Sequence, residues 1–146
     1  MAIVTEELVL LNAAAATKED AVKLAGDLLV RAGRVKPAYV EGMLARERSM
    51  STYMGNGVAI PHGEYENRAD IIETGISVVQ VRDGVAWEDG ERAYLVIGIA
   101  ALADEHVSVL SNLAEVVEEP EDAEFLAQAT DAHVIVERLD RPVEEA

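Results

Sequence analysis

The chain has 146 residues, half of them hydrophobic, and its 28 acidic against 12 basic side chains give a formal net charge of −16. Such a surface repels nucleic acid, whose binding depends on lysine and arginine to neutralise phosphates, and it disfavours contact with anionic membranes. The absence of cysteine excludes disulfides, thiolate metal sites and cysteine nucleophiles.

The predicted elements begin with a short strand at Glu7–Leu11, followed by a helix that starts at Thr17. The sequence Thr17-Lys18-Glu19-Asp20 is typical of a helix N-terminus, where a side-chain oxygen accepts a hydrogen bond from a free backbone N–H. Gly33 provides a stop signal. Between these signals the apolar residues recur at helical spacing: Ala21, Leu24, Ala25, Leu28 and Leu29.

A second helix is expected to begin near Pro37, which suits a first helical turn, and to end near Arg46 and Glu47. The residues expected on its buried face are Val40, Met43 and Leu44. A stretch that contains several glycines follows, and within it Val58–Ile60 is typical of a short strand.

Two further strands are predicted in the middle of the chain. Gly75–Val81 alternates well enough for one of them, and Tyr94–Ala100 is a continuous apolar run, as expected of a central strand buried on both faces. Between them, Asp83-Gly84 indicates a turn that leads to Val85 and Trp87.

Helical patterns dominate the last third. Asp104 is expected to cap one helix, and Pro120 to open another with Phe125 and Leu126 facing the core. Ala132–Leu139 suits a strand or a helix equally. Because helices and strands interleave, the predicted fold class is α/β, a single domain in which helices flank a mixed sheet of about five strands.

We expect the domain to cover residues 1–140 and residues 141–146 to form a flexible C-terminal tail. Met1–Leu10 lacks the basic start of a secretory signal. The longest apolar run, Ala93–Ala103, is shorter than the ~18 residues that a membrane-spanning helix needs. We therefore expect a soluble cytoplasmic protein that is not inserted in a membrane.

The first candidate for a catalytic residue is His62, one of three histidines in the chain. It follows an apolar strand and lies between Pro61, which restricts the backbone before it, and Gly63, which allows another group to approach closely. This side chain is expected to be presented to solvent rather than packed in the core. The Pro-His-Gly tripeptide alone is a weak signal.

The wider context is specific. The segment Gly55-Asn56-Gly57-Val58-Ala59-Ile60-Pro61-His62-Gly63 resembles the active-site motif of enzyme IIA of the fructose/mannitol class, from the bacterial phosphoenolpyruvate-dependent sugar phosphotransferase system. Upstream, 43–48 and 51–55 continue the match. Downstream, Asp104-Glu105-His106-Val107 stands where that family carries its second histidine. The resemblance covers about residues 5–139 and is strongest to the mannitol branch.

The resemblance implies that the chain is a phosphoryl carrier. In this family the carrier protein HPr donates a phosphoryl group to the histidine that matches His62, and a cysteine on a IIB domain receives it next. The sugar is phosphorylated as it passes through the membrane component IIC. The expected partners are thus HPr and the IIB domain of a mannitol transporter, with no nucleic acid and no cofactor.

The same resemblance assigns the site residues. His62 is expected to be the nucleophile and carrier, and a neutral imidazole with an ordinary pKa of about 6.5 suits this role at cytoplasmic pH. His106 and Arg46 are expected to stabilise the phosphoryl oxygens by hydrogen bonding and charge. The alternatives are that His106 is an exposed residue of a first helical turn, that Arg46 is a surface cation, and that Arg48 takes its place.

Other residues receive structural interpretations. His133 matches no family motif, Trp87 suits packing, and Thr52 and Asn56 are site-lining candidates that could equally satisfy turns. No close ligand spacing such as His-x-x-x-His occurs, so no metal is expected.

Two competing functions stay open. One is a nitrogen-type regulatory IIA, which shares the histidine motif but acts by phosphorylation-dependent binding to regulatory partners. The other is an interaction module that has lost phosphoryl transfer. A fructose or another hexitol specificity also stays open, because sugar choice resides in IIB and IIC. The acidity either keeps the protein soluble or steers a basic partner.

Overall fold

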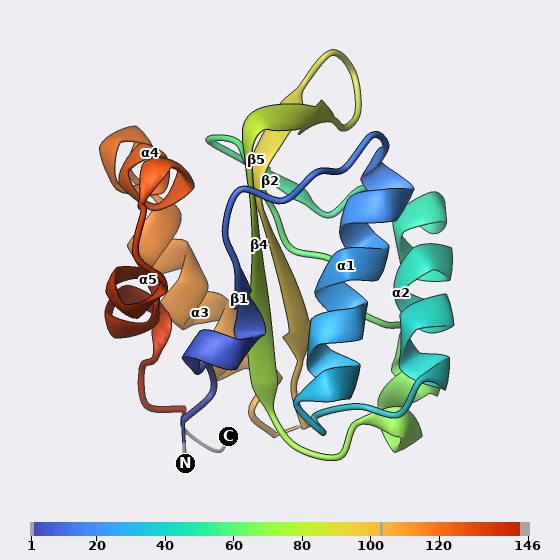
Figure 1. Cartoon of the computed structure of the whole chain (residues 1–146). Coiled ribbons are helices and arrows are strands. Elements are labelled where there is room, and N and C mark those ends of the chain that lie inside the picture. The colour runs from blue at the N-terminus through green and yellow to red at the C-terminus, as the bar shows by residue number, and fades with distance from the viewer. Residues whose placement is uncertain (1, 103, 144–146) are drawn as a thin grey trace.

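The computed structural model describes residues 2–102 and 104–143. In that part of the chain, five strands form one mixed sheet in the order β1-β4-β5-β3-β2 (Figure 1). The strands are β1 (Val9–Leu10), β2 (Tyr53–Gly55), β3 (Val58–Ala59), β4 (Gly75–Ala86) and β5 (Arg92–Ala100). β1 is parallel to β4 and β3 is parallel to β5, whereas the long central pair β4 and β5 is antiparallel. The predicted α/β class with a mixed sheet is confirmed.

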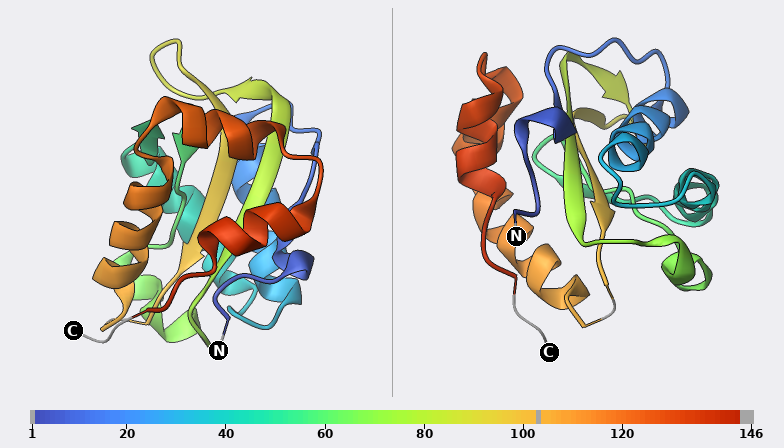
Figure 2. Two further views of the ribbon diagram at one scale, coloured as in Figure 1. Left: turned by 90° about the vertical axis from the view of Figure 1, so that its left-hand side faces the viewer. Right: turned by 60° about the horizontal axis from the view of Figure 1, so that its bottom comes forward.

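Helices cover both faces of the sheet (Figures 1 and 2). On one face lie α1 (Lys18–Arg31) and α2 (Ala38–Ser49), and on the other lie α3 (His106–Val117), α4 (Pro120–Gln128) and α5 (Ala132–Leu139). Two short 3-10 helices, η1 (Glu6–Leu8) and η2 (Tyr65–Asp70), complete the fold. No helix in the described ranges is both long enough and apolar enough to cross a lipid bilayer.

The core lies on both sides of β4 and β5. Their residues Ile76, Val78, Leu95 and Ile97 are fully buried, because helices close over the sheet from each side. This explains why Tyr94–Ala100 reads as a continuous apolar run rather than an alternating one, and it confirms the prediction of a central strand.

The predicted helix boundaries are confirmed at three places. The Thr17 hydroxyl accepts a hydrogen bond of 3.2 Å from the backbone N–H of Asp20, Gly33 follows α1 with a φ of 74°, and Pro120 is the first residue of α4. The expected cap at Asp104 is wrong. Glu105 occupies the N-cap of α3 and makes no side-chain cap bond, because its carboxylate accepts a hydrogen bond from the Thr74 hydroxyl.

The predicted turn at Asp83-Gly84 is also wrong. β4 continues through this pair, the pairing with β5 shifts register there, and Gly84 has a φ of 77°. The chain reverses at the next such pair, where Asp89 and Gly90 have φ of 51° and 81°. The glycine of each pair has a positive φ, but only in the second pair does the aspartate have one too, and the cross-strand pairing decides which pair closes the hairpin and which is a bulge.

Three further segments differ from the predictions or decide between them. Phe125 was expected to face the core but is 46% exposed, with the Arg138 guanidinium over its ring, while Leu126 is fully buried. The ambiguous segment 132–139 is the helix α5. Of the expected tail, Arg141 forms an ion pair of 3.0 Å with Glu115, and residues 144–146 lie outside the described part, so a flexible tail stays a prediction.

Candidate functional site

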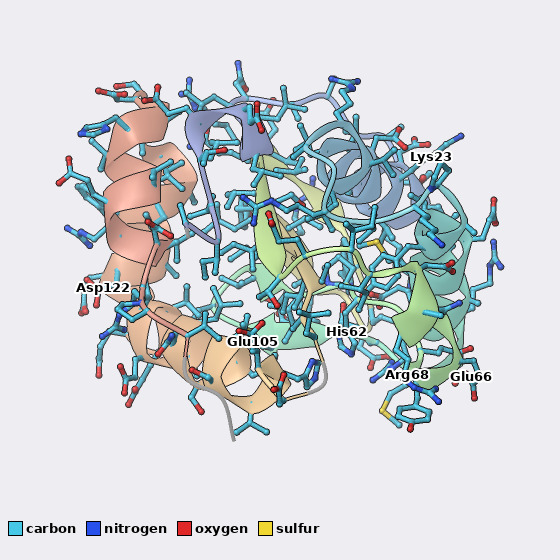
Figure 3. The ribbon with its side chains drawn as sticks, turned by 90° about the horizontal axis from the view of Figure 1, so that it is seen from below. Lys23, His62, Glu66, Arg68, Glu105 and Asp122 are labelled. Carbon is cyan, nitrogen blue, oxygen red and sulfur yellow. The ribbon has the colours of Figure 1, made fainter. Side chains whose placement is uncertain are left out.

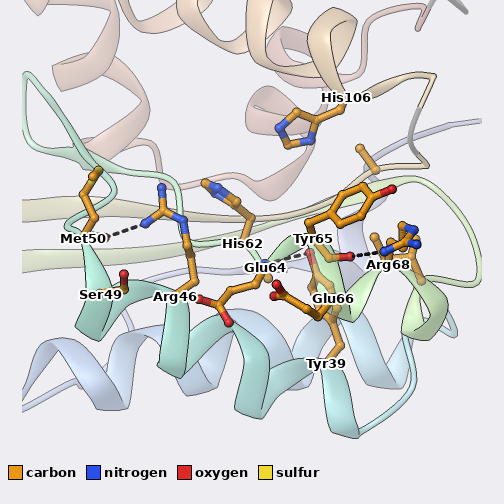
Figure 4. Close-up of a pocket in the computed structure, with 13 residues that line it drawn as sticks. Tyr39, Arg46, Ser49, Met50, His62, Glu64, Tyr65, Glu66, Arg68 and His106 are labelled. Atoms are coloured by element: carbon orange, nitrogen blue, oxygen red, sulfur yellow. Dashed lines mark hydrogen bonds between the residues drawn. The ribbon is translucent and has the colours of Figure 1, made fainter.

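A cavity of about 600 Å³ opens where the carboxyl ends of β3 and β5 meet. The two strands are parallel, so the residues that follow each of them emerge at the same edge of the sheet. His62 follows β3, and His106 begins α3 a few residues after β5. Both histidines line the cavity together with Arg46 from α2 (Figure 4), and Figure 3 shows the position of His62 in the whole molecule seen from below. The three residues predicted from the sequence are thus brought to one place.

The backbone around His62 is fixed by the neighbouring strand. His62 pairs with Ile99 in an isolated parallel bridge, and the Ile99 N–H donates to the Pro61 carbonyl at 2.9 Å. The His62 Nδ1 lies 2.8 Å from the carbonyl oxygen of Ile60. A carbonyl oxygen can only accept, so Nδ1 carries the proton and Nε2 of the neutral ring carries the lone pair.

The pKa of the His62 imidazole is lowered from its ordinary value. Burial is the main cause, because it disfavours the charged ring, and the positive charges of Arg46 and His106 act in the same direction. The hydrogen bond to the Ile60 carbonyl and the carboxylate of Glu47 partly oppose the shift. The neutral ring, the form with a free lone pair, is therefore favoured.

His106 faces His62 across the cavity, with the ring centroids 5.9 Å apart and the ring planes 66° to each other. It is the first residue of α3, where the backbone N–H groups of the first turn and the positive end of the helix dipole attract negative charge. The turn before it is held by Thr74, whose hydroxyl accepts from the Leu102 N–H at 3.0 Å and donates to Glu105.

Arg46 lies in the last turns of α2 and points towards the His62 ring, and its guanidinium also donates to the Met50 carbonyl at 2.7 Å (Figure 4). Because Met50 directly follows the last residue of α2, this bond orients the Arg46 side chain at the end of the helix. The other N–H groups of the guanidinium are not used in this bond. Arg48 is exposed and does not line the cavity. The structure therefore favours Arg46 over Arg48.

Glu47, the neighbour of Arg46, anchors this end of α2. Its buried carboxylate accepts hydrogen bonds from the N–H and hydroxyl of Thr52 and, at 3.2 Å, from the Trp87 indole, and Lys18 lies 3.9 Å away. Sequence reasoning did not single out Glu47. No sequence pattern indicated that Glu47 is buried, since an acidic residue in a helix usually faces solvent.

Two residues that do line the cavity, Tyr39 and Arg68, were also not singled out by sequence reasoning. Tyr39 is buried at the floor, and Arg68 lies on the rim with its guanidinium 3.7 Å from the Tyr65 ring centroid. The rim also carries the carboxylates of Glu64 and Glu66. Neither Tyr39 nor Arg68 stands in a motif that marks it for chemistry, so only the packing of η2 against α2 reveals them.

The remaining candidates have structural roles. Thr52 is bound to Glu47, and Asn56 donates to the carbonyls of Val117 and Glu118 at the end of α3, so neither lines the cavity. Trp87 belongs to the core, as expected. His133 is exposed on α5 and lies 2.8 Å from Glu137. In ranges 2–102 and 104–143, no group of three or more His, Asp or Glu side chains could hold a metal ion.

Comparison with known proteins gives a consistent picture. Residues 2–141 match the family described as "Phosphoenolpyruvate-dependent sugar phosphotransferase system, EIIA 2". Over 92% of its length the chain is 48% identical to a multiphosphoryl transfer protein of Rhodobacter capsulatus, of which it spans only 16%. It is also 40% identical to the mannitol-specific phosphotransferase enzyme IIA component of Bacillus subtilis, with 88% of this chain and 90% of that protein covered.

Among solved structures, the fold is similar to that of enzyme IIAMTL in its complex with phosphorylated enzyme IIBMTL from Escherichia coli. The TM-score is 0.88 and the sequence identity 38%, over 93% of this chain and 96% of that one. An identity at this level, over nearly all of both chains, supports a shared family as well as a shared fold.

Proposed function

The chain belongs to the EIIA 2 family of the phosphoenolpyruvate-dependent sugar phosphotransferase system, and from that premise we propose that His62 carries a phosphoryl group between two protein partners. The observation that supports this most directly is the protonated Nδ1 of His62, 2.8 Å from the Ile60 carbonyl, on a ring that shares a cavity with His106 and Arg46. This arrangement leaves the lone pair on Nε2.

In the first half-reaction, the Nε2 lone pair attacks the phosphorus of the phosphorylated donor, which we take to be HPr. The bond between phosphorus and the donor atom breaks, and its electron pair leaves with the donor. The His62 ring becomes cationic, and its Nδ1 proton stays on the hydrogen bond to Ile60. Arg46 and His106 stabilise the oxygens of the transferring group, which is the main work that phosphoryl transfer requires of a protein.

In the second half-reaction, a thiolate of the acceptor attacks the same phosphorus. The Nε2–P bond breaks, the electron pair returns to Nε2, and His62 becomes neutral again. This chain has no cysteine, so the thiolate must come from another protein or domain. A IIB domain fits, because the solved relative of this fold is in complex with phosphorylated IIBMTL.

The proposed setting is mannitol uptake in the cytoplasm. Support comes from the Bacillus subtilis relative, whose name specifies mannitol and which matches this chain over nearly its whole length. The multiphosphoryl transfer proteins are more similar in sequence but much longer, and their name specifies no sugar. The sugar specificity of the pathway therefore requires a separate experiment.

The test is a labelling reaction with phosphoenolpyruvate, enzyme I and HPr, in which the chain is compared with its His62→Ala variant. The wild type should acquire an acid-labile, base-stable phosphoryl group, and the variant should not. The control is His133→Ala, which removes an exposed histidine outside the cavity and should label normally. Labelling of His62→Ala at the wild-type rate would overturn the assignment of the acceptor.

The purified phosphorylated chain is then mixed with IIB domains of mannitol and fructose transporters. Faster transfer to the mannitol IIB would support the proposed sugar, and faster transfer to the fructose IIB would replace it. Failure to transfer to any IIB, with labelling on His62 intact, would favour the regulatory nitrogen-type alternative.

A further inference from the structure

The Tyr39 side chain reaches from α2 to the strand edge next to His62. It is 3% exposed and lines the cavity. Its hydroxyl accepts a hydrogen bond of 2.9 Å from the Gly63 N–H and donates one of 2.8 Å to the Ile99 carbonyl.

These two bonds take the place of one backbone hydrogen bond of the parallel strand pairing. When His62 pairs with Ile99 in a parallel bridge, the expected bonds run from the Ile99 N–H to the Pro61 carbonyl and from the Gly63 N–H to the Ile99 carbonyl. The first is present at 2.9 Å. The second is relayed through the Tyr39 hydroxyl. The Tyr39 hydroxyl thus links the residue after His62 to β5.

Gly63 fits closely against the same tyrosine. A Cβ atom at this position would lie 2.6 and 2.9 Å from two carbons of the Tyr39 ring, which is closer than side chains pack. The absence of a side chain therefore lets the backbone rest on the ring. Ring and hydroxyl together fix the position of the residue that directly follows His62.

The Tyr39 hydroxyl has no proton left to offer a phosphoryl group. Its single proton is used in the bond to Ile99, and burial raises the pKa of the phenol, so the proton stays in place. Any effect of Tyr39 on the chemistry must therefore pass through the backbone of His62 and Gly63.

We infer that Tyr39 is a positioning residue: its hydroxyl bridge between Gly63 and Ile99 fixes the backbone of His62 and so aims Nε2 into the cavity. The consequence for catalysis rests on the proposed function, since the bridge matters for transfer only if His62 is the acceptor. The geometric part, that the bridge orients the His62 ring, does not depend on it.

The test is Tyr39→Phe, which keeps the ring that packs against Gly63 and removes only the bridging oxygen. The chain offers a matched control in Tyr53, whose hydroxyl accepts from the Gly57 N–H at 3.0 Å and donates to the Arg92 carbonyl at 3.3 Å. Tyr53→Phe removes the same atom from the same kind of bridge, but at the opening end of β3 and outside the cavity that contains His62.

Two readouts separate positioning from stability. With phospho-HPr as donor, Tyr39→Phe should lower the maximal rate of phosphoryl acceptance about tenfold or more, because small displacements of a reacting atom are costly, and should leave the half-saturating donor concentration unchanged. Nitrogen-15 NMR of His62 should show a mixture of ring tautomers and an imidazole pKa moved towards its ordinary value. Tyr53→Phe should change neither.

Wild-type rates with a wild-type His62 spectrum in Tyr39→Phe would overturn the inference, as would equal slowing by both substitutions. The NMR readout needs no phosphate, so it decides the positioning role even if no chain variant is labelled and the proposed function fails. If Tyr39→Phe does not fold, amide hydrogen exchange of the wild type still tests the bridge. Rapid exchange of the Gly63 N–H would refute it.

Discussion

A histidine that carries phosphate must be neutral when it attacks and must tolerate a positive charge afterwards. The surroundings of His62 meet these two demands with different groups. Burial, and to a lesser extent the electrostatic effects of Arg46 and His106, favour the neutral ring, and the Ile60 carbonyl accepts a hydrogen bond from Nδ1 when the ring becomes cationic. The two effects oppose each other in the pKa of the ring, and burial is the larger, so the pKa stays below its ordinary value.

The first prediction concerns pH. The pKa of folded His62 is lowered below the ordinary value of about 6.5. Phosphoryl acceptance should thus persist at a pH where an exposed histidine is already protonated, and its midpoint should lie below that of free imidazole. Single-turnover labelling across pH, with the donor kept saturating, measures the midpoint. A midpoint above the ordinary value would contradict the proposed environment.

The lowered pKa of His62 also predicts how the stability of the fold depends on pH. Because its pKa is lowered in the folded protein, His62 binds a proton more readily in the unfolded chain. Its contribution to the free energy of unfolding is therefore complete above the unfolded pKa. It is lost as the pH falls through the folded pKa. Denaturant unfolding of the wild type should weaken over this acidic window. His62→Asn should flatten that part of the profile, and an unchanged profile would show that another group causes it.

A second prediction distinguishes the two arginines of α2. Arg46→Gln should slow phosphoryl acceptance by about 10²-fold, a typical loss for one donor that stabilises a transition state. Arg48→Gln removes the same charge from the same helix, but from an exposed position outside the cavity, and should change the rate little. Equal losses in both variants would mean that general charge, and not the placement of Arg46, is what matters.

A third prediction separates the half-reactions at His106. His106→Ala should still accept phosphate, because the nucleophile is intact, but onward transfer to IIB should slow by about 10²-fold. Rapid-quench measurement of each half-reaction checks this. Unchanged rates in both would leave His106 as an exposed residue of the first turn of α3.

At the scale of elements, the site depends on a parallel pair inside a mixed sheet. β3 has only two residues, yet its parallel pairing with β5 brings His62 and the start of α3 to one edge. α2 supplies Arg46 and Tyr39 from one face of the sheet, and α3 supplies His106 at the sheet edge. The site therefore exists only when the helices of both layers are in place.

The fourth prediction tests how α2 is anchored. Glu47→Gln keeps the shape of the side chain but replaces a carboxylate that accepts three hydrogen bonds and lies 3.9 Å from Lys18 with a neutral amide, so charge-assisted bonds become neutral ones. The free energy of unfolding should fall by about 1–3 kcal/mol. Trp87 fluorescence reports the change locally. Glu41→Gln, on an exposed position of the same helix, is the control and should have almost no effect.

At the scale of the whole molecule, the formal net charge of −16 affects both stability and association with partners. Self-repulsion destabilises a compact state of high charge, and salt screens it. The fifth prediction is that the melting temperature rises when salt increases from about 0.01 M to 0.1 M, over which the screening length falls from about 30 Å to 10 Å. Over the same range, association with a basic partner should slow. A rate independent of salt would show that the acidic surface does not steer the partner.

Much of the fold could be predicted from the sequence because its signals are local. Thr17, Gly33 and Pro120 act on the backbone within a few residues, and the apolar run at Tyr94–Ala100 follows directly from burial on two faces. The two Asp-Gly pairs show the limit. They carry the same local signal, and only the register between β4 and β5 made one of them the turn.

The sequence by itself determined the class of fold and the family resemblance, and it singled out His62 as the candidate phosphoryl acceptor, because a motif of consecutive residues can be read directly from the chain. Only the tertiary structure decided which side chains, beyond the expected His106 and Arg46, support the site of that histidine. Tyr39, Glu47 and Thr74 act through hydrogen bonds to residues up to 60 positions away, and no local pattern encodes such contacts. Helix and sheet packing creates them, so they follow from the fold and not from the spacing of residues.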